Sequence, residues 1–280
     1  MNKTIKLFVS ILLVFLALTH AAKSDPKRAE PESSGVSQYD SISITILYSN
    51  NPFDKRLTTS WGFACLIKGI DKMILFDAGA DGKILLSNME KMGINPSDID
   101  IVFLSHTHSD HVGGLWAFLK KNHDVNVYLP AFSGAEISGR IKAFGANVIK
   151  VSRPIRITDV AYSTGSMGRG VSEQSLIIRT PEGIVIVTGC AHPGIVEIVK
   201  RAIFSFGRNV LLLVGGFHLI SKSEKEIYDI ARTIKSLGVK YVAPEHCSGD
   251  KARKIFKKIY GKNYIESGVG KTIYIHELKQ

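Results

Sequence analysis

The chain reads Ser105-His106-Thr107-His108-Ser109-Asp110-His111 directly after the apolar run 101–104 and shortly before Gly113-Gly114. Three imidazoles and one carboxylate therefore follow a segment whose composition predicts a buried strand. The backbone of a tight turn changes direction between residues, so all four side chains can point to one place. Neutral imidazole and carboxylate suit zinc, iron or manganese. The alternative is a histidine-rich surface loop, but the preceding buried strand favours a metal site.

The same arrangement recurs three times later in the chain. An apolar segment ends in a turn with glycine or proline, and each turn carries a histidine: Gly189-Cys190-Ala191-His192, Gly216-Phe217-His218 and Glu245-His246-Cys247. In layered α/β proteins, strand ends at one edge are the usual place for a site. Ligands from four strand ends could enclose two metal ions, which polarise a carbonyl or phosphoryl oxygen. Each later histidine, taken alone, could also be structural.

The pattern of apolar residues predicts one domain over residues 42–280. Hairpins are expected at 62–76 and 175–187, and each is followed by alternating strands and helices, with a final strand at 272–276. Because both halves repeat this order, we expect two sheets packed face to face with helices outside, which is an α/β sandwich.

The amino-terminal residues 1–22 have the features of a secretory signal peptide. Lys3 and Lys6 form a basic region, residues 7–18 are almost all apolar, and small residues follow at Ala21 and Ala22. We therefore expect an exported protein, periplasmic or extracellular. The alternative is an uncleaved segment that anchors the chain to a membrane. Residues 23–41 are polar and contain several prolines and serines, which predicts a flexible linker.

The net charge and the cysteine content indicate which classes of partner and which stabilising bonds to expect. The net charge of +11 could attract anionic substrates or membrane surfaces. The basic residues are scattered and no aromatic stripe lies between them, so nucleic acid is not an expected partner. Three cysteines are too few for a disulfide framework. Cys190 and Cys247 lie close to histidines, which suggests metal binding or sensitivity to oxidation, whereas Cys65 fits a buried strand.

The histidine motif resembles the signature of the metallo-β-lactamase superfamily. Asp77, within Leu75-Phe76-Asp77-Ala78-Gly79, resembles an early element that supports the metal site in that superfamily. The three later turns and Gly268-Val269-Gly270 are similar to the dihydropterin ribofuranosylaminobenzene phosphate synthase-like branch. The resemblance extends over about residues 42–277 and implies a four-layer αβ/βα sandwich with two mixed sheets.

The resemblance also implies a division of ligands between two metals. His106, His108 and His192 would bind the first metal, and Asp110, His111 and His246 would bind the second. The sequence departs from the common pattern, because Glu173-Gln174 stand where the third-motif histidine is expected. Gly189-Cys190 occupy the place of the usual bridging residue. We therefore expect His192 to complete the site and keep Cys190 as the alternative ligand.

Other candidate residues have less specific signals. His218 follows a buried strand and two glycines, and could bind substrate, transfer a proton or support a ligand. Arg169 lies in a glycine-rich loop and could hold a phosphate through two hydrogen bonds, or it could be an ordinary surface residue. Trp61 is expected to pack in the core, although it could also line the pocket.

The leading functional hypothesis is a hydrolase that uses a metal-bound hydroxide oriented by Asp110, with two divalent ions that stabilise oxyanion charge. Zinc is the expected metal, with iron, manganese or magnesium as alternatives. The substrate would be a small molecule, anionic or phosphorylated. The branch resemblance implies an alternative, a dihydropterin-type transferase that releases pyrophosphate, although an exported protein does not suit pterin synthesis. A non-catalytic metal-binding module is the third hypothesis.

Overall fold

The computed structural model describes residues 38–207 and 209–278. The expected signal peptide, residues 1–22, and nearly all of the expected linker lie outside this range, so export stays a prediction. Residues Gln38–Ser41, at the end of the linker, form a short 3₁₀ helix. Within the described ranges, none of the helices has the length and apolar character that a membrane span requires.

The first sheet contains seven strands in the order β13-β1-β2-β3-β4-β5-β6. The antiparallel strands β13, β1, β2 and β3 stand at one side, and β3 to β6 run parallel to one another. The strands are β1 (Ser43–Ser49), β2 (Phe63–Lys68), β3 (Ile74–Phe76), β4 (Ile101–Phe103), β5 (Asn126–Pro130), β6 (Asn147–Val151) and β13 (Thr272–Tyr274).

The second sheet contains six strands in the order β12-β11-β10-β9-β8-β7. Here β10, β11 and β12 are parallel, and β7 to β10 pair antiparallel. The strands are β7 (Ile155–Arg156), β8 (Ala161–Ser163), β9 (Leu176–Thr180), β10 (Gly183–Thr188), β11 (Val210–Gly216) and β12 (Tyr241–Glu245). Both sheets are therefore mixed.

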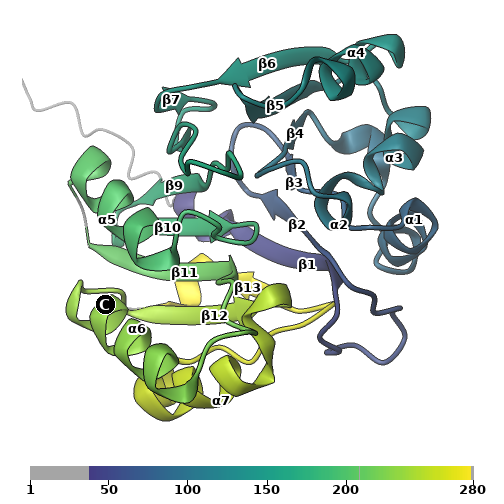
Figure 1. Cartoon of the computed structure of the whole chain (residues 1–280). Coiled ribbons are helices and arrows are strands. Elements are labelled where there is room, and N and C mark those ends of the chain that lie inside the picture. Colours follow the sequence, from purple (N-terminus) through teal and green to yellow (C-terminus); the bar gives the residue numbers. More distant parts are fainter. Residues whose placement is uncertain (1–37, 208, 279–280) are drawn as a thin grey trace, which may run out of the picture. The chain divides into compact units, whose positions relative to one another are not determined.

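Helices cover the outer faces of the two sheets (Figure 1). One set is α1 (Gly82–Lys91), α2 (Ser109–Val112), α3 (Leu115–Lys121) and α4 (Ala135–Ala143); the other is α5 (Ile195–Phe206), α6 (Glu224–Ser236) and α7 (Gly249–Tyr260). Short 3₁₀ helices lie at Pro96–Asp98, His246–Ser248, Gly261–Asn263 and Ile275–Glu277. The last of these replaces the end of the strand that the sequence predicts at 272–276.

Alternating side chains divide the apolar residues into three layers. On β10, Val185 and Val187 point into the core between the sheets, whereas Ile184 and Ile186 pack against the helices of the second set. Phe76 and Phe103, on neighbouring strands, stack in the central core with ring centroids 5.4 Å apart. A third cluster joins the first sheet to α1, α3 and α4. The predicted four-layer α/β sandwich is confirmed.

The parallel strands of both sheets bring their carboxyl ends to one edge of the sandwich. The residues that follow β3, β4, β10, β11 and β12 are those that the sequence singles out as candidate ligands. Four non-glycine residues of the described chain have positive φ: Asp77 (54°), Ala191 (61°), His218 (54°) and His246 (47°). All four follow these strands. Backbone strain of this kind concentrates at functional sites.

Candidate metal centre

The first group of possible ligands consists of His106, His108 and His192. One ligand atom from each lies within 4.8 Å of those of the other two. The ring of His106 is 4.7 Å from both of the others, centroid to centroid, and His108 is 4.8 Å from His192. His106 is buried, His192 is half-buried and His108 is exposed. The group therefore opens to solvent on one side.

The Nε2 atom of His106 is buried and has no hydrogen-bond partner among the described residues. The tautomer follows from the neighbour, because the Ser105 hydroxyl donates to Asp77 Oδ2 at 2.7 Å and can then accept from His106 Nδ1–H at 2.9 Å. A lone pair on Nε2 is left facing the group. A buried polar atom without a partner costs free energy, and a metal ion at this place would remove that cost.

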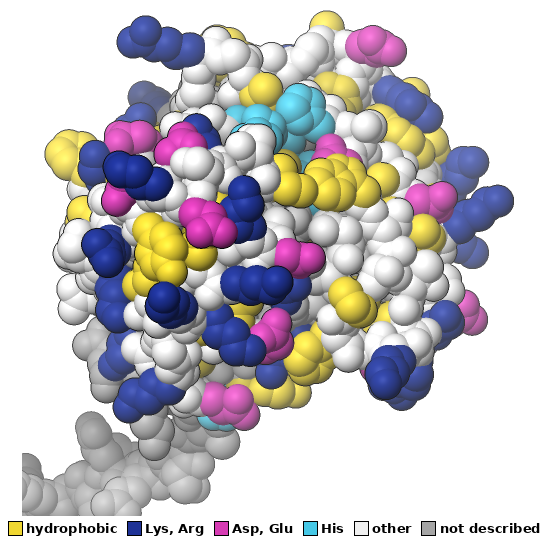
Figure 2. All heavy atoms as spheres, turned by 60° about the horizontal axis from the view of Figure 1, so that its bottom comes forward, with side chains coloured by type: hydrophobic (Ala, Val, Ile, Leu, Met, Phe, Trp, Pro, Cys, Tyr) yellow, Lys and Arg dark blue, Asp and Glu magenta, His cyan; other side chains and the backbone are white. Residues whose placement is uncertain are grey.

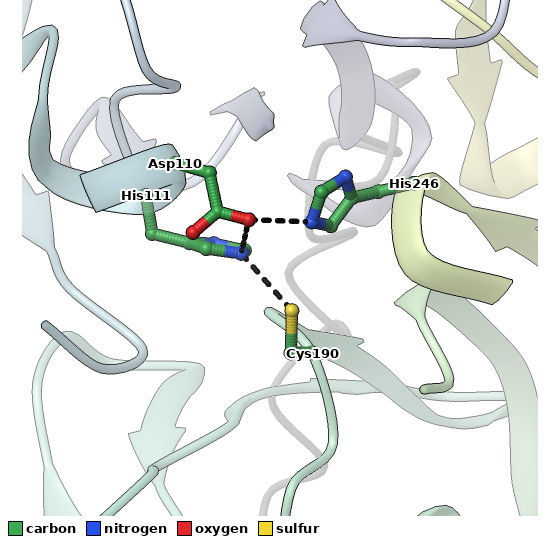
Figure 3. Close-up of side chains that lie close together, drawn as sticks. All are labelled: Asp110, His111, Cys190 and His246. Carbon is green, nitrogen blue, oxygen red and sulfur yellow. Dashed lines mark hydrogen bonds and ion pairs between the residues drawn. The ribbon is translucent and has the colours of Figure 1, made fainter. Parts of the chain in front are cut away.

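The second group consists of Asp110, His111, Cys190 and His246 (Figure 3). His111 Nε2 lies 3.1 Å from Cys190 Sγ and 3.8 Å from Asp110 Oδ2. His246 Nε2 lies 3.1 Å from the same carboxylate oxygen. Two imidazoles, one thiol and one carboxylate are a donor set that suits zinc. Cys190 thus belongs to this group and His192 to the first, although the sequence offers them as alternatives.

Asp77 positions one ligand of each group: it contacts His111 directly, and it contacts His106 through Ser105. Its carboxylate accepts hydrogen bonds from the backbone and hydroxyl of Ser105, both at 2.7 Å, and contacts His111 Nδ1 at 2.6 Å. Because Nδ1–H of His111 donates to this carboxylate, Nε2 keeps its lone pair for the second group. Partners of this kind fix the orientation of metal-binding histidines.

His246 is positioned by residues from the first hairpin. Its Nδ1 lies 2.9 Å from Asn50 Oδ1, so Nδ1–H is the donor and Nε2 faces Asp110. The indole Nε1–H of Trp61 donates to the same Asp110 oxygen at 3.0 Å, and its ring contacts that of His246 edge-on at 4.6 Å. Trp61 is 47% exposed, so the prediction of core packing is wrong. Trp61 instead covers one side of the second group.

Glu173, which stands where the resemblance leads one to expect a histidine, holds the loop 190–192 in place. Its carboxylate is buried, and accepts hydrogen bonds from the backbone N–H groups of Cys190, Ala191 and His192 at 2.8–2.9 Å. The same carboxylate lies 2.8 Å from His192 Nδ1. Burial alone would raise the pKa of Glu173, but the hydrogen bonds from His192 outweigh it and lower the pKa to about 2. This anion therefore orients the loop that carries two candidate ligands.

We expect the substitution Glu173→Gln to weaken metal binding at the first group by about 10- to 100-fold. Each carboxylate oxygen accepts two N–H donors, and the amide nitrogen of glutamine would face two of those donors without accepting either. Competition with a chelator measures the affinity. Glu197→Gln on the exposed surface of α5 is the matched control. An unchanged affinity in Glu173→Gln would show that His192 does not depend on this carboxylate.

His218 lies at the exposed side of the centre. Its ring centroid is 4.6 Å from that of His192, and it forms a third close group with Cys190 and Cys247. The contact with the Cys247 thiol raises the pKa of His218. Arg169 is exposed in the loop between β8 and β9 and belongs to none of these groups.

Burial makes the inner histidines neutral. It lowers the pKa of His106 to about 3 and that of His111 to about 4, and neighbouring imidazoles act in the same direction. Burial also favours protonated Asp110, but the neighbouring His246 and His111 hold its pKa below the usual value. Neutral imidazole and ionised carboxylate are the forms that bind metals. His106, His111 and Asp110 are therefore in the forms that can bind a metal ion.

Histidine side chains reach the surface together on the face shown in Figure 2, beside apolar and acidic side chains. The structure brings all six predicted histidine and aspartate ligands into the two groups, together with Cys190. Sequence reasoning missed the supporting roles of Asn50, Trp61 and Glu173. The sequence does signal Glu173, which stands where the resemblance leads one to expect a ligand, and Trp61, which could line the pocket, whereas Asn50 carries no signal.

Comparisons with known proteins agree with this geometry. The sequence profile of the metallo-beta-lactamase superfamily matches residues 62–246. The chain is 30% identical to the 7,8-dihydropterin-6-methyl-4-(beta-D-ribofuranosyl)-aminobenzene-5'-phosphate synthase of Methanocaldococcus jannaschii, and the match covers 80% of this chain and 92% of that protein.

Solved structures show the same fold. The crystal structure of Tm1679, described as a metal-dependent hydrolase of the beta-lactamase superfamily, matches with a TM-score of 0.71 and 28% identity, over 83% of this chain and 98% of Tm1679. The short form of human tRNase Z matches with a TM-score of 0.58 and 14% identity, and the match covers 83% of this chain and 99% of that protein. At this identity the match shows a shared fold alone. The chain therefore belongs to the metallo-β-lactamase superfamily and resembles its dihydropterin ribofuranosylaminobenzene phosphate synthase-like branch.

Proposed function

We propose that the protein is a dinuclear metal-dependent hydrolase that acts on a small ester or phosphoester. The observation that carries this proposal is the pair of adjacent ligand groups, one of three imidazoles and one of Asp110, His111, Cys190 and His246. Each group contains one imidazole whose pKa burial lowers, His106 in the first and His111 in the second, and the first group opens to solvent. Thiol and imidazole donors favour zinc over magnesium.

Two divalent ions at these groups would act as Lewis acids on the substrate oxygen and would make a bound water acidic. The role of the protein is to hold the ligand side chains in fixed orientations. Asp77 and Glu173 fix the orientation of His111 and His192. Asp110 is a carboxylate that can accept a hydrogen bond from an attacking water and so orient it. His218, exposed beside His192, is placed to transfer a proton to a leaving group.

A second candidate function is the transferase reaction, and the similarity to the Methanocaldococcus jannaschii synthase favours it, since the match covers nearly all of that protein. The same two groups would then bind the pyrophosphate that leaves a dihydropterin donor. The similarity to Tm1679, which is described as a hydrolase, supports the first candidate over a comparable length.

Metal analysis and a substrate panel test these proposals. The purified chain, loaded with zinc and freed of excess metal, should contain about two ions per chain. Phosphomonoesters, phosphodiesters and lactones test hydrolysis. Release of pyrophosphate from a dihydropterin pyrophosphate, in the presence of an aminobenzene ribofuranoside phosphate, tests transfer. A chain that retains no metal after loading would contradict both enzymatic proposals and favour a structural role for the histidine cluster.

A further inference from the structure

A third group of possible ligands lies beside the first two. It consists of Cys190, His218 and Cys247, and one ligand atom from each lies within 4.8 Å of those of the other two. All three side chains follow strand ends of the second sheet. Both thiols are free and buried, whereas His218 is exposed. The proposed two-metal site uses Cys190 but gives no role to Cys247, so a buried sulfur donor is left over.

Backbone hydrogen bonds hold the three turns of this group together. The N–H of Gly216 donates to Gly189 O at 3.1 Å, which joins the end of β11 to the turn after β10. The N–H groups of Leu219 and Ile220 donate to Cys247 O at 3.2 and 3.1 Å, which joins the turn after β11 to the turn after β12. The three donors are therefore close together before any ion binds, and a preorganised group of this kind favours binding.

Gly216 leaves the space that the Cys247 thiol occupies. A Cβ at position 216 would overlap Gly189 O and would lie 2.7 Å from Cys247 Sγ. Gly216 does not have a positive φ, so its own backbone conformation does not demand glycine. The demand comes from its neighbours, because only a residue without a side chain lets both the turn of Cys190 and the thiol of Cys247 approach the end of β11 this closely.

The donor atoms of the third group favour a thiophilic ion. Two of the three donors are sulfur atoms and the third is an imidazole nitrogen, and soft ligands of this kind select copper(I) or zinc over magnesium, calcium and manganese. Zinc takes four ligands, whereas copper(I) is stable with the three that this group supplies. The group contains no carboxylate, which separates its chemistry from that of the second group.

Cys190 belongs to both the second and the third group. Its Sγ lies 3.1 Å from His111 Nε2 on one side and within 4.8 Å of Cys247 Sγ on the other. A thiolate has enough lone pairs to bridge two ions, so the third position can fill while the second group keeps its own ion. The ring of His218 lies 4.6 Å from that of His192, centroid to centroid, which places the third group next to the first as well.

We propose that Cys190, His218 and Cys247 form a third metal position, which binds copper(I) beside the two-metal site. The proposal rests on the proposed function only in that Cys190 is shared with the second group. Copper(I) at this position would occupy the ring nitrogen with which His218 transfers a proton, and would compete for the thiol of Cys190. Copper(I) would therefore inhibit the hydrolase without entering the two groups that hold its catalytic metals.

The test uses the full chain, loaded with zinc, freed of excess metal and titrated without oxygen with copper(I) against the chelator bicinchoninate. The wild type should bind about one copper(I) per chain, with its zinc content unchanged. Cys247→Ser, which keeps the shape of the side chain, should weaken copper(I) binding roughly 100-fold or more. His218→Asn, which tolerates the positive φ at this position, should weaken it about 10-fold or more. Cys65→Ala, which removes a buried thiol from β2, is the control and should leave the affinity unchanged.

Zinc analysis and X-ray absorption at the copper edge, on the same samples, separate the third position from the first two. Copper(I) bound by two sulfur atoms and one nitrogen, with one sulfur fewer in Cys247→Ser, supports the proposal. Because His218 is exposed, His218→Asn gives the same test if Cys247→Ser lowers stability.

Three results would overturn the third position. They are no copper(I) binding in competition with bicinchoninate, an affinity that neither variant changes, and copper(I) uptake matched by an equal loss of zinc. Copper(I) binding that depends on Cys247, in a chain that transforms none of the substrates of the panel, would support the third position while refuting the proposed enzyme.

Discussion

Replacing His108 by alanine is expected to lower kcat/KM for the active substrate by roughly a thousand-fold or more and to reduce metal content from about two ions to one. His108 supplies one of three imidazoles in the first group, and two imidazoles retain an ion far less well. A loss of about 4 kcal/mol of transition-state stabilisation corresponds to three powers of ten in rate. Steady-state kinetics and elemental analysis on one preparation measure both effects.

Because His108 is exposed, its replacement should affect metal binding and activity without affecting folding. Its side chain is exposed, so the thermal unfolding temperature of the metal-free variant should be close to that of the metal-free wild type. His123→Ala, at another exposed histidine outside the ligand groups, is the matched control. Activity that survives His108→Ala with both metals still bound would refute the first group as a catalytic metal site.

The sequence predicts most of the fold because its elements are locally encoded. The apolar runs of β4, β10 and β11 predict buried strands, and the turns after them carry the histidines. Parallel strands end at the same edge of their sheet, which brings His192 and His246 together after β10 and β12. His106 follows β4 of the other sheet and meets them because the two sheets pack face to face. The histidine motifs at the ends of predicted strands therefore predict a site at one edge of the sheets.

The division of ligands between the two groups could not be predicted in this way. Cys190 and His192 are two residues apart in one loop, and spacing alone makes them competitors for one position. In the structure Ala191 has a φ of 61°, which reverses the backbone between them, so the thiol reaches the second group and the imidazole the first. Alanine rarely adopts a positive φ, so the residue type at position 191 does not predict this reversal of the backbone.

Polar contacts between residues far apart in the chain also could not be predicted from the sequence. Glu173 reaches the 190–192 loop from a separate hairpin, and Asn50 reaches His246 across nearly two hundred residues of chain. Trp61 is a large aromatic residue of a kind usually found in cores, but here it is partly exposed and its indole N–H donates to Asp110. The positions of such residues follow no sequence period, because each depends on contacts with residues far away in the chain.

Asp77→Ala is expected to cost about 3 kcal/mol in the free energy of unfolding of the metal-free protein. The carboxylate is fully buried and serves Ser105 N–H, the Ser105 hydroxyl and His111 Nδ1–H. Alanine would leave these donors without an acceptor in the core. Urea unfolding in the presence of a chelator measures the change without the contribution of bound metal. Asp71→Ala, on the exposed turn between β2 and β3, is the control.

The free energy of unfolding that is lost in Asp77→Ala should change with pH in a known direction. Burial raises the pKa of Asp77 to about 7, against the opposing effects of His106 and Ser105. A carboxyl group whose folded pKa is raised stabilises the fold most below its unfolded pKa, and that stability is lost as pH rises through about 7. The cost of Asp77→Ala should therefore be larger near about pH 5.5 than near about pH 8.5. Equal costs at both pH values would show that Asp77 does not titrate in this range, and a cost below about 1 kcal/mol at either would show that its hydrogen bonds are replaceable.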